Sequence, residues 1–268
     1  MLGKLLKHEF RATARVMLPL YGAVLILAVL ANLSFAFVEA TDSLFLHILC
    51  IFFIVVFFIG VVGAFVLTIV VMVGRFYRNL LKNQGYLMHT LPVTAHGHIW
   101  SKLIVSLVWF AATAVFIGIV FLLTGLIQTN TSIGDILAGL PSWAEIREFL
   151  TESGILGQSA LVSSELIAII IAECLVLCLH FYAALALGHA CTKSKVLLSI
   201  VFFVAISVVF SVLENACAIG FIAADYAIME GVEHLSAILG VALIIQIVEG
   251  VALYIATWLG LKKGLNLE

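Results

Sequence analysis

Residues 44–74 read LFLHILCIFFIVVFFIGVVGAFVLTIVVMVG, an apolar run that contains no Asp, Glu, Lys or Arg. A helix needs about 20 apolar residues to cross the roughly 30 Å hydrocarbon core of a bilayer. At 1.5 Å per residue this run would be about 46 Å long. The run therefore predicts a transmembrane helix that tilts or extends beyond the membrane.

The composition of the whole chain indicates that the bilayer is its solvent. Hydrophobic residues make up 64% of the 268 residues and charged residues only 10%, against about 45–50% and about 25% in soluble domains. Because no linker rich in Ser, Pro or Gly interrupts the chain, we expect one all-α transmembrane domain over residues 1–268. Six runs are long enough to span a membrane, approximately 16–38, 44–74, 99–127, 160–188, 196–213 and 235–261.

The distribution of basic residues predicts the orientation of these spans. Twelve of the thirteen Lys and Arg residues fall at the N-terminus, between spans two and three, between spans four and five, or in the tail. Basic residues concentrate on the cytosolic side of membrane proteins, so both termini are predicted to be cytosolic. The longest outer loop is then 128–159, which contains the remaining basic residue, Arg147.

The first fifteen residues predict an amphipathic helix at the inner membrane surface. Lys4, Lys7, Arg11 and Arg15 recur at three- and four-residue spacing and so share one helical face. Leucines and Phe10 supply apolar surface elsewhere on the helix. A helix of this kind lies in the interface between headgroups and acyl chains. The alternative is a plain cytosolic end of the first span, with charges that only fix its topology.

The inner segment Arg75–Lys102 is too rich in aromatic and apolar residues to be an ordinary solvated loop. Its apolar residues among the charges are Phe76, Tyr77, Leu80, Leu81, Tyr86, Leu87, Leu91 and Trp100. Helical spacing continues from Arg75, Gly85 can end that helix, and Pro92 breaks the chain again. This pattern favours a compact docking surface for another protein. The alternative is a segment folded against the membrane.

The same segment resembles the permease subunits of bacterial ATP-binding-cassette (ABC) exporters of the type-2 class. The matching residues are Phe76, Tyr77, Arg78, Gly85, Tyr86, Leu87, Thr90, Leu91, Pro92, Ser101 and Lys102. Gln84 stands where that family has Glu. The tail LKKGLNLE (261–268) also matches, with Gly264 where a third basic residue is typical.

The resemblance implies that the chain forms a membrane path and couples to a separate ATPase. The expected coupling residues are Arg75, Phe76, Tyr77, Arg78, Lys82, Gly85, Tyr86, Leu87, Thr90, Leu91 and Pro92. It also implies two ATPase subunits, a second permease that is identical or related, and a place in the bacterial cytoplasmic membrane among its lipids. ATP would be bound by the partner, so no cofactor is expected in this chain.

Two carboxyl groups are predicted to lie deep in the membrane. Glu173 and Glu249 are each about twelve residues from the outer end of their spans, which places both near mid-bilayer. A charged acid there costs about 2.5–3.5 kcal/mol, so it should face the helix bundle or a wet cavity. The two acids either contact a cationic substrate or a proton, or they hydrogen-bond between helices. His180, two turns from Glu173, is a candidate partner.

The sequence lacks the motifs that mark several classes of protein. No GxxxxGK[ST] or HExxH motif occurs, so neither a nucleotide-binding loop nor a zinc-protease site is expected, and the chain is not predicted to be an enzyme. His89, His96 and His98 lack an adjacent Cys or carboxylate to complete a metal site, and they are expected to be surface histidines. No basic patch predicts nucleic-acid binding.

The sequence thus predicts the transmembrane subunit of an ATP-driven exporter. Its substrate is expected to be an amphipathic peptide, drug or lipid. One alternative is an ion- or proton-coupled carrier that uses Glu173 and Glu249. The other is a membrane subunit that does not transport, such as an assembly partner or a sensor.

Overall fold

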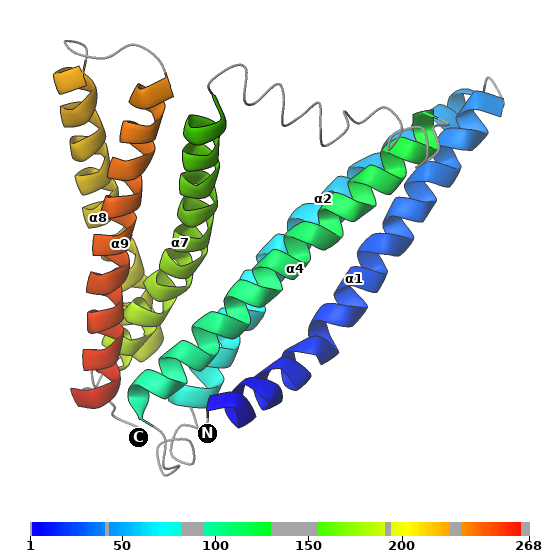
Figure 1. Ribbon diagram of the computed structural model, residues 1–268. Coiled ribbons are helices and arrows are strands. Elements are labelled where there is room, and N and C mark those ends of the chain that lie inside the picture. The colour runs from blue at the N-terminus through cyan, green and yellow to red at the C-terminus, as the bar shows by residue number, and fades with distance from the viewer. Residues whose placement is uncertain are drawn as a thin grey trace. The chain divides into compact units, whose positions relative to one another are not determined.

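The computed structural model describes residues 2–40, 43–81, 94–129, 155–190, 194–225 and 232–263 (Figure 1). All regular structure in these residues is helical. The elements are α1 (Leu2–Ala40), α2 (Leu44–Phe76), the π-helix η1 (Tyr77–Leu81), α4 (Ala95–Thr129), α7 (Ile155–His189), α8 (Lys195–Asp225) and α9 (Val232–Lys263). Six helices are long and apolar enough to cross a membrane, which confirms the expected all-α fold of a multi-pass membrane protein.

The helices extend beyond the apolar runs that predicted them. The fifth span was expected to end at Leu213, but α8 continues to Asp225. The first was expected from Val16, but α1 begins at Leu2. Polar residues can continue a helix past the hydrocarbon because each residue still adds one backbone hydrogen bond to the preceding turn. Most of the predicted outer loop lies outside the described residues.

The amphipathic N-terminal segment is the first part of α1 rather than a separate helix. Lys4, Lys7 and Arg11 have exposed side chains. Leu6 and Phe10 pack against a buried cluster from α1, α2 and α4, formed by Met17, Met72, Val105 and Trp109. Part of the segment's apolar face is therefore covered by protein. Its position at the membrane surface stays a prediction.

The chain divides into two compact units, and the boundaries between them fall inside α2 and α4. The first unit contains α1, α2 up to Met72 and α4 from Ile104. The second contains α7, α8 and α9 together with the described residues of 73–103. The end of α2 and the start of α4 thus belong to the α7–α9 unit, although both helices are continuous across the boundary.

Small residues allow close packing in the first unit. Its core contains Val24, Ala28 and Ala31 of α1, Phe57, Val61 and Ala64 of α2, and Ile117 and Val120 of α4. A Cβ added at Gly60 would lie only 2.7 Å from Cδ1 of Leu27. Close packing matters here because lipid tails are as apolar as leucine, so membrane helices associate largely through van der Waals contact.

Hydroxyl groups connect the helices of the first unit. Trp109 Nε1 donates to Thr13 Oγ1 at 2.7 Å, and Thr13 in turn donates to the Glu9 carbonyl at 2.9 Å. Tyr21 Oη and Thr113 Oγ1 are 2.8 Å apart. Such bonds are worth about 0.6–2 kcal/mol each between membrane helices. The contacts of Trp109 with Thr13 and of Tyr21 with Thr113 thus join α4 to α1 through uncharged groups.

In the second unit, α7 and α9 run parallel and remain in contact along their length. Ser236 meets Glu165 near the start of both helices, and Gly260 meets Ala186 near their ends. A Cβ at Gly260 would lie 2.8 Å from Cβ of Ala186. A Cβ at Gly188 would lie 2.5 Å from the backbone nitrogen of Ser199 on α8. These glycines let three helices approach closely (Figure 1).

We predict that Gly260→Ala destabilises the protein by about 1–3 kcal/mol, because the added methyl group overpacks the contact with α7. Gly240→Ala on the same helix is the matched control, since a Cβ there has no neighbour within 4 Å and alanine favours a helix. Thermal unfolding in detergent, followed by size-exclusion chromatography, would measure both. Equal midpoints for the two variants would contradict the close packing.

Candidate functional site

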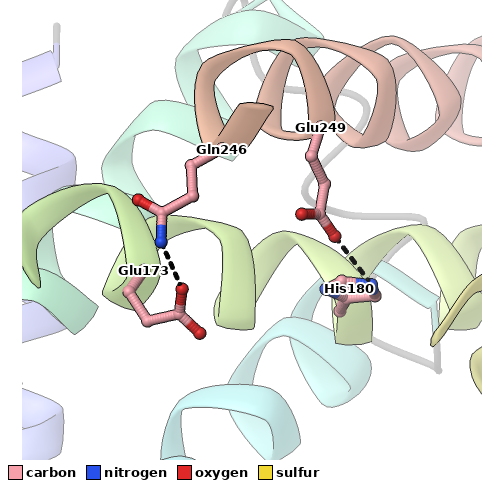
Figure 2. A network of polar contacts seen from close by, with 4 residues as sticks. All are labelled: Glu173, His180, Gln246 and Glu249. Carbon is pink, nitrogen blue, oxygen red and sulfur yellow. Dashed lines mark hydrogen bonds and ion pairs between the residues drawn. The ribbon is translucent and has the colours of Figure 1, made fainter. Parts of the chain in front are cut away.

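A network of polar side chains joins α7 to α9 inside the second unit (Figure 2). Gln246 Nε2 donates to Glu173 Oε2 at 2.7 Å. His180 Nε2 lies 3.2 Å from Glu249 Oε1. Both acids and His180 were predicted from the sequence, and the structure brings all three into one network.

The network lies far from both ends of its helices. Glu249 is thirteen residues from Ser236 and thirteen from Lys262, the limits of the last candidate span, and Glu173 is twelve residues from Leu161. Glu249 is only 2% exposed, whereas the side chain of Glu173 is exposed. Ionisable residues at such positions pair with one another or face a cavity, because hydrocarbon cannot solvate them.

His180 is paired with Glu249 and not with Glu173, the partner that its sequence position indicated. Glu173 and His180 are seven residues apart on α7 and share one face. Seven residues correspond to about 10 Å along a helix axis, which is too far for a direct contact. Each side chain therefore meets a residue of the neighbouring helix α9.

A third carboxyl group comes from α8. The carboxyl group of Glu214 is close enough to interact with that of Glu249, so Glu249 has an imidazole from α7 and a carboxyl from α8 as neighbours.

Aromatic rings and a backbone bond fix the imidazole of His180. The ring hydrogen-bonds the backbone of Val176, one turn earlier on α7. Phe203 and Phe210 of α8 present their edges to it, with ring centroids 6.4 Å and 5.9 Å away. Since its position is fixed, the imidazole can hold or release a proton beside Glu249 without moving.

Sequence reasoning missed Gln246 and Glu214. Gln246 interrupts an otherwise apolar stretch of α9, and such an amide is a detectable signal for a polar contact between helices. Glu214 was missed because the fifth span was expected to end at Leu213. The structure places Glu214 inside the candidate span Lys195–Cys217.

Some side chains of the expected coupling residues are buried, and others are exposed to solvent. Phe76 is fully buried and stacks on Tyr182 of α7, with ring centroids 4.0 Å apart and planes 7° from parallel. Tyr77 meets His189 edge-on, Arg75 is partly buried, and Arg78 is exposed. Phe76 therefore packs against the protein's own helix and cannot dock a partner directly. Lys82, Gly85, Tyr86, Leu87, Thr90, Leu91 and Pro92 lie outside the described residues.

The π-helix η1 adds to the contact between the expected coupling segment and α7. Leu80 and Leu81 of η1 are buried, and η1 packs against α7. Single π-helical turns are rare, and those inside α-helices are frequently found at functional sites. Tyr182, which receives Phe76, follows His180 by two residues on α7. The segment and the polar network are thus connected through one helix.

The described histidines at the start of α4 are engaged in packing. His96 Nδ1 is 2.6 Å from Tyr254 Oη, and its ring stacks on Trp258. His98 is 1% exposed, in contrast to the surface position expected for it. Within the described residues, no group of three or more His, Cys, Asp or Glu side chains is arranged to hold a metal ion. His89 lies outside those residues.

The first unit has an apolar groove of about 270 Å³ between α1 and α4. Its lining includes Leu25, Val29, Leu33 and Leu123, together with the hydrogen-bonded pair Asn32 and Thr124. A groove of this composition accommodates hydrocarbon, which fits the expected contact with membrane lipid.

No family model matches the sequence, and neither a curated protein nor a solved structure matches it at a significant level. The likeness to the exporter permeases therefore rests on the residues quoted from 75–102 and 261–268.

We predict that His180→Phe lowers the free energy of unfolding by about 3 kcal/mol, because it leaves the buried carboxyl group of Glu249 without its imidazole neighbour. His180→Phe combined with Glu249→Leu should recover most of that loss, since an apolar pair needs no partner. Thermal unfolding of the two variants and of Glu249→Leu completes the double-mutant cycle. Additive effects of the two single substitutions would contradict the pairing.

Proposed function

We propose that the chain is the transmembrane subunit of an ATP-driven exporter, which forms the substrate path and couples to a separate ATPase. The observation that carries the proposal is the network of Glu173, Gln246, His180 and Glu249 in the membrane interior. Ionisable groups are costly there and mark substrate or ion pathways.

The resemblance of 75–102 to exporter permeases supports ATP as the energy source. In the proposed mechanism, closure of the ATPase dimer moves this segment, and the spans reorient around a central path. The stacking of Phe76 on Tyr182 supports a route for that movement, because a shift of Phe76 would press on α7. The helix α7 carries Glu173 and His180.

The exposed side chains of Glu173 and Glu214 support a path shared with a second permease. An exposed acid within the membrane needs a wet cavity or a protein neighbour. A second six-span subunit, identical or related, would supply that neighbour. The proposed setting is the bacterial cytoplasmic membrane, with lipid around the pair and two ATPase subunits on the cytosolic face.

A second candidate is a proton- or ion-coupled carrier that works without ATP. The observation that favours it is the contact of Glu249 with both His180 and Glu214, since these groups can exchange a proton. The two candidates differ in their energy source. Transport that stops when ATP is depleted while ion gradients are held would exclude the carrier, and transport that continues would exclude the exporter.

We predict that the tagged chain, isolated from its native membrane in mild detergent, retains a protein with nucleotide-binding motifs. Tyr86→Ala and Leu91→Ala should reduce the recovered ATPase at least about tenfold, because each removes apolar contact area at the proposed interface. Ser164→Ala, on the predicted outer half of α7, is the control. Mass spectrometry of the bound proteins provides the measurement. A chain isolated only with copies of itself would contradict the exporter.

We predict that Glu249→Gln reduces transport by about tenfold or more while the protein still inserts and assembles. Glutamine keeps the shape and a hydrogen bond but cannot carry the negative charge. Glu165→Gln is the matched control, because Glu165 lies on α7 outside the network and accepts a hydrogen bond from Ser236. Uptake into reconstituted vesicles compares the variants. Equal transport by Glu249→Gln, Glu173→Gln and the wild type would show that the network has no role in transport.

A further inference from the structure

We propose that one face of α8 is the contact surface for a second copy of this chain. In this contact two α8 helices pack in parallel, and Asn215 of one copy lies beside Asn215 of the other. The inference rests on the proposed function, in which a second permease completes the path. It deepens that function by identifying the second permease as a copy of this chain and α8 as its point of contact.

The inner face of α8 packs on α7 within the second unit. Phe203 and Phe210 present their edges to the imidazole of His180. One turn before Phe203, the buried Ser199 lies against Gly188 of α7. These residues of α8 recur at three- and four-residue spacing and therefore form one stripe along the helix.

A second stripe runs along the opposite face of α8. Val208 follows Ser199 by nine residues, which is about two and a half helical turns, so the two stripes face opposite ways. The outer stripe consists of Leu197, Val201, Val204, Val208, Ser211 and Asn215. Its four apolar side chains are between 52% and 63% exposed, and its two polar side chains are also exposed. All six lie inside the candidate span Lys195–Cys217, so the described part of the chain leaves a whole membrane-spanning face of α8 uncovered.

The spacing of the outer stripe is that of a two-stranded helix pair. Alternating steps of four and three residues form a heptad pattern, which keeps one seam facing a partner helix. One of the two seam positions is occupied by Val201, Val208 and Asn215. Valine at this position is typical of two parallel strands, and a single Asn there specifies their register and number. Pairs of membrane helices mostly cross at angles similar to those of such coiled coils.

Asn215 is the member of the stripe that most needs a neighbour. Its amide nitrogen donates to the backbone carbonyl of Ser211 at 2.7 Å and lies 3.4 Å from the Ser211 hydroxyl. Its hydrogen bonds to described residues therefore stay within one turn of α8, and they leave its amide oxygen free to accept. Hydrocarbon offers no donor, and Asn side chains of membrane helices hydrogen-bond across to neighbouring helices.

A second copy of the chain complements this stripe better than lipid does. Two copies have the same orientation in the membrane because the same basic residues fix it. Their α8 helices therefore run parallel, and a two-fold contact sets each position of the stripe opposite its own counterpart. An amide both donates and accepts hydrogen bonds, so two Asn215 side chains can bond reciprocally. A lipid tail can fill the space between the valines but cannot bond the amide.

The first test is disulfide crosslinking in the cell membrane, in a chain whose five native cysteines are replaced by alanine. Val204→Cys and Val208→Cys place a thiol on the stripe. Val209→Cys is the matched control, because Val209 and Val208 are 55% and 56% exposed but lie about 100° apart around the helix. With copper phenanthroline as the oxidant, the stripe variants should yield at least about fivefold more product of twice the chain mass, since a disulfide requires Cα atoms within about 7 Å.

The second test measures self-association by energy transfer between labelled copies, at increasing dilution in lipid vesicles. Asn215→Leu should weaken self-association by roughly threefold to thirtyfold, the range that one interhelical hydrogen bond in a membrane supports. Ala216→Leu is the control, because the exposed Ala216 is about 100° around the helix from Asn215. The crosslinking variants leave Asn215 in place, so they remain informative if Asn215→Leu fails to fold.

Equal crosslinking of the stripe variants and Val209→Cys would overturn the inference, as would equal self-association of Asn215→Leu and the wild type. A stripe covered by lipid, or by the first unit of the same chain, would give only the monomer mass and would also overturn it. Neither test involves an ATPase. Crosslinked copies without a recovered ATPase would leave this contact and remove ATP-driven export. A recovered ATPase without crosslinked copies would leave the exporter and remove α8 as the contact between its permeases.

Discussion

The burial of Glu249 among apolar helices is the constraint on which the second unit of this protein depends. Hydrocarbon cannot solvate a carboxyl group, so polar neighbours must come from other helices. Those neighbours are His180 from α7 and Glu214 from α8. Glu249 of α9 therefore has its polar neighbours only when α7 and α8 are packed beside α9. The parallel packing of α7 and α9 is the geometry that meets this requirement.

The two units satisfy their polar groups in different ways. The first unit uses hydroxyls, an indole and an amide, in pairs such as Trp109 with Thr13 and Tyr21 with Thr113. The second has carboxyls in contact with an imidazole and an amide, in the pairs Glu249 with His180 and Glu173 with Gln246. Neutral pairs hold helices together at little electrostatic cost, whereas titratable groups add the ability to change charge. This contrast is why the proposed substrate path is placed in the second unit.

The residues that were expected to couple to an ATPase acquire two separate roles in the fold. Phe76 is buried against Tyr182 and acts inside the protein. Arg78 is exposed and available to a partner. The resemblance groups these residues together because they are adjacent in sequence. Their side chains point differently because successive residues of a helix are about 100° apart around its axis.

The sequence by itself determined the helical fold, the six long apolar helices and the place of Glu173 and Glu249 near the middle of theirs, because hydrophobic length and residue spacing along one helix are local properties. Only the tertiary structure decided that His180 meets Glu249, that Gln246 holds Glu173 and that Glu214 joins them. The register between neighbouring helices is set by close contacts such as Gly260 with Ala186. That register depends on residues far apart in the chain, so no single helix reveals which partner a side chain will meet.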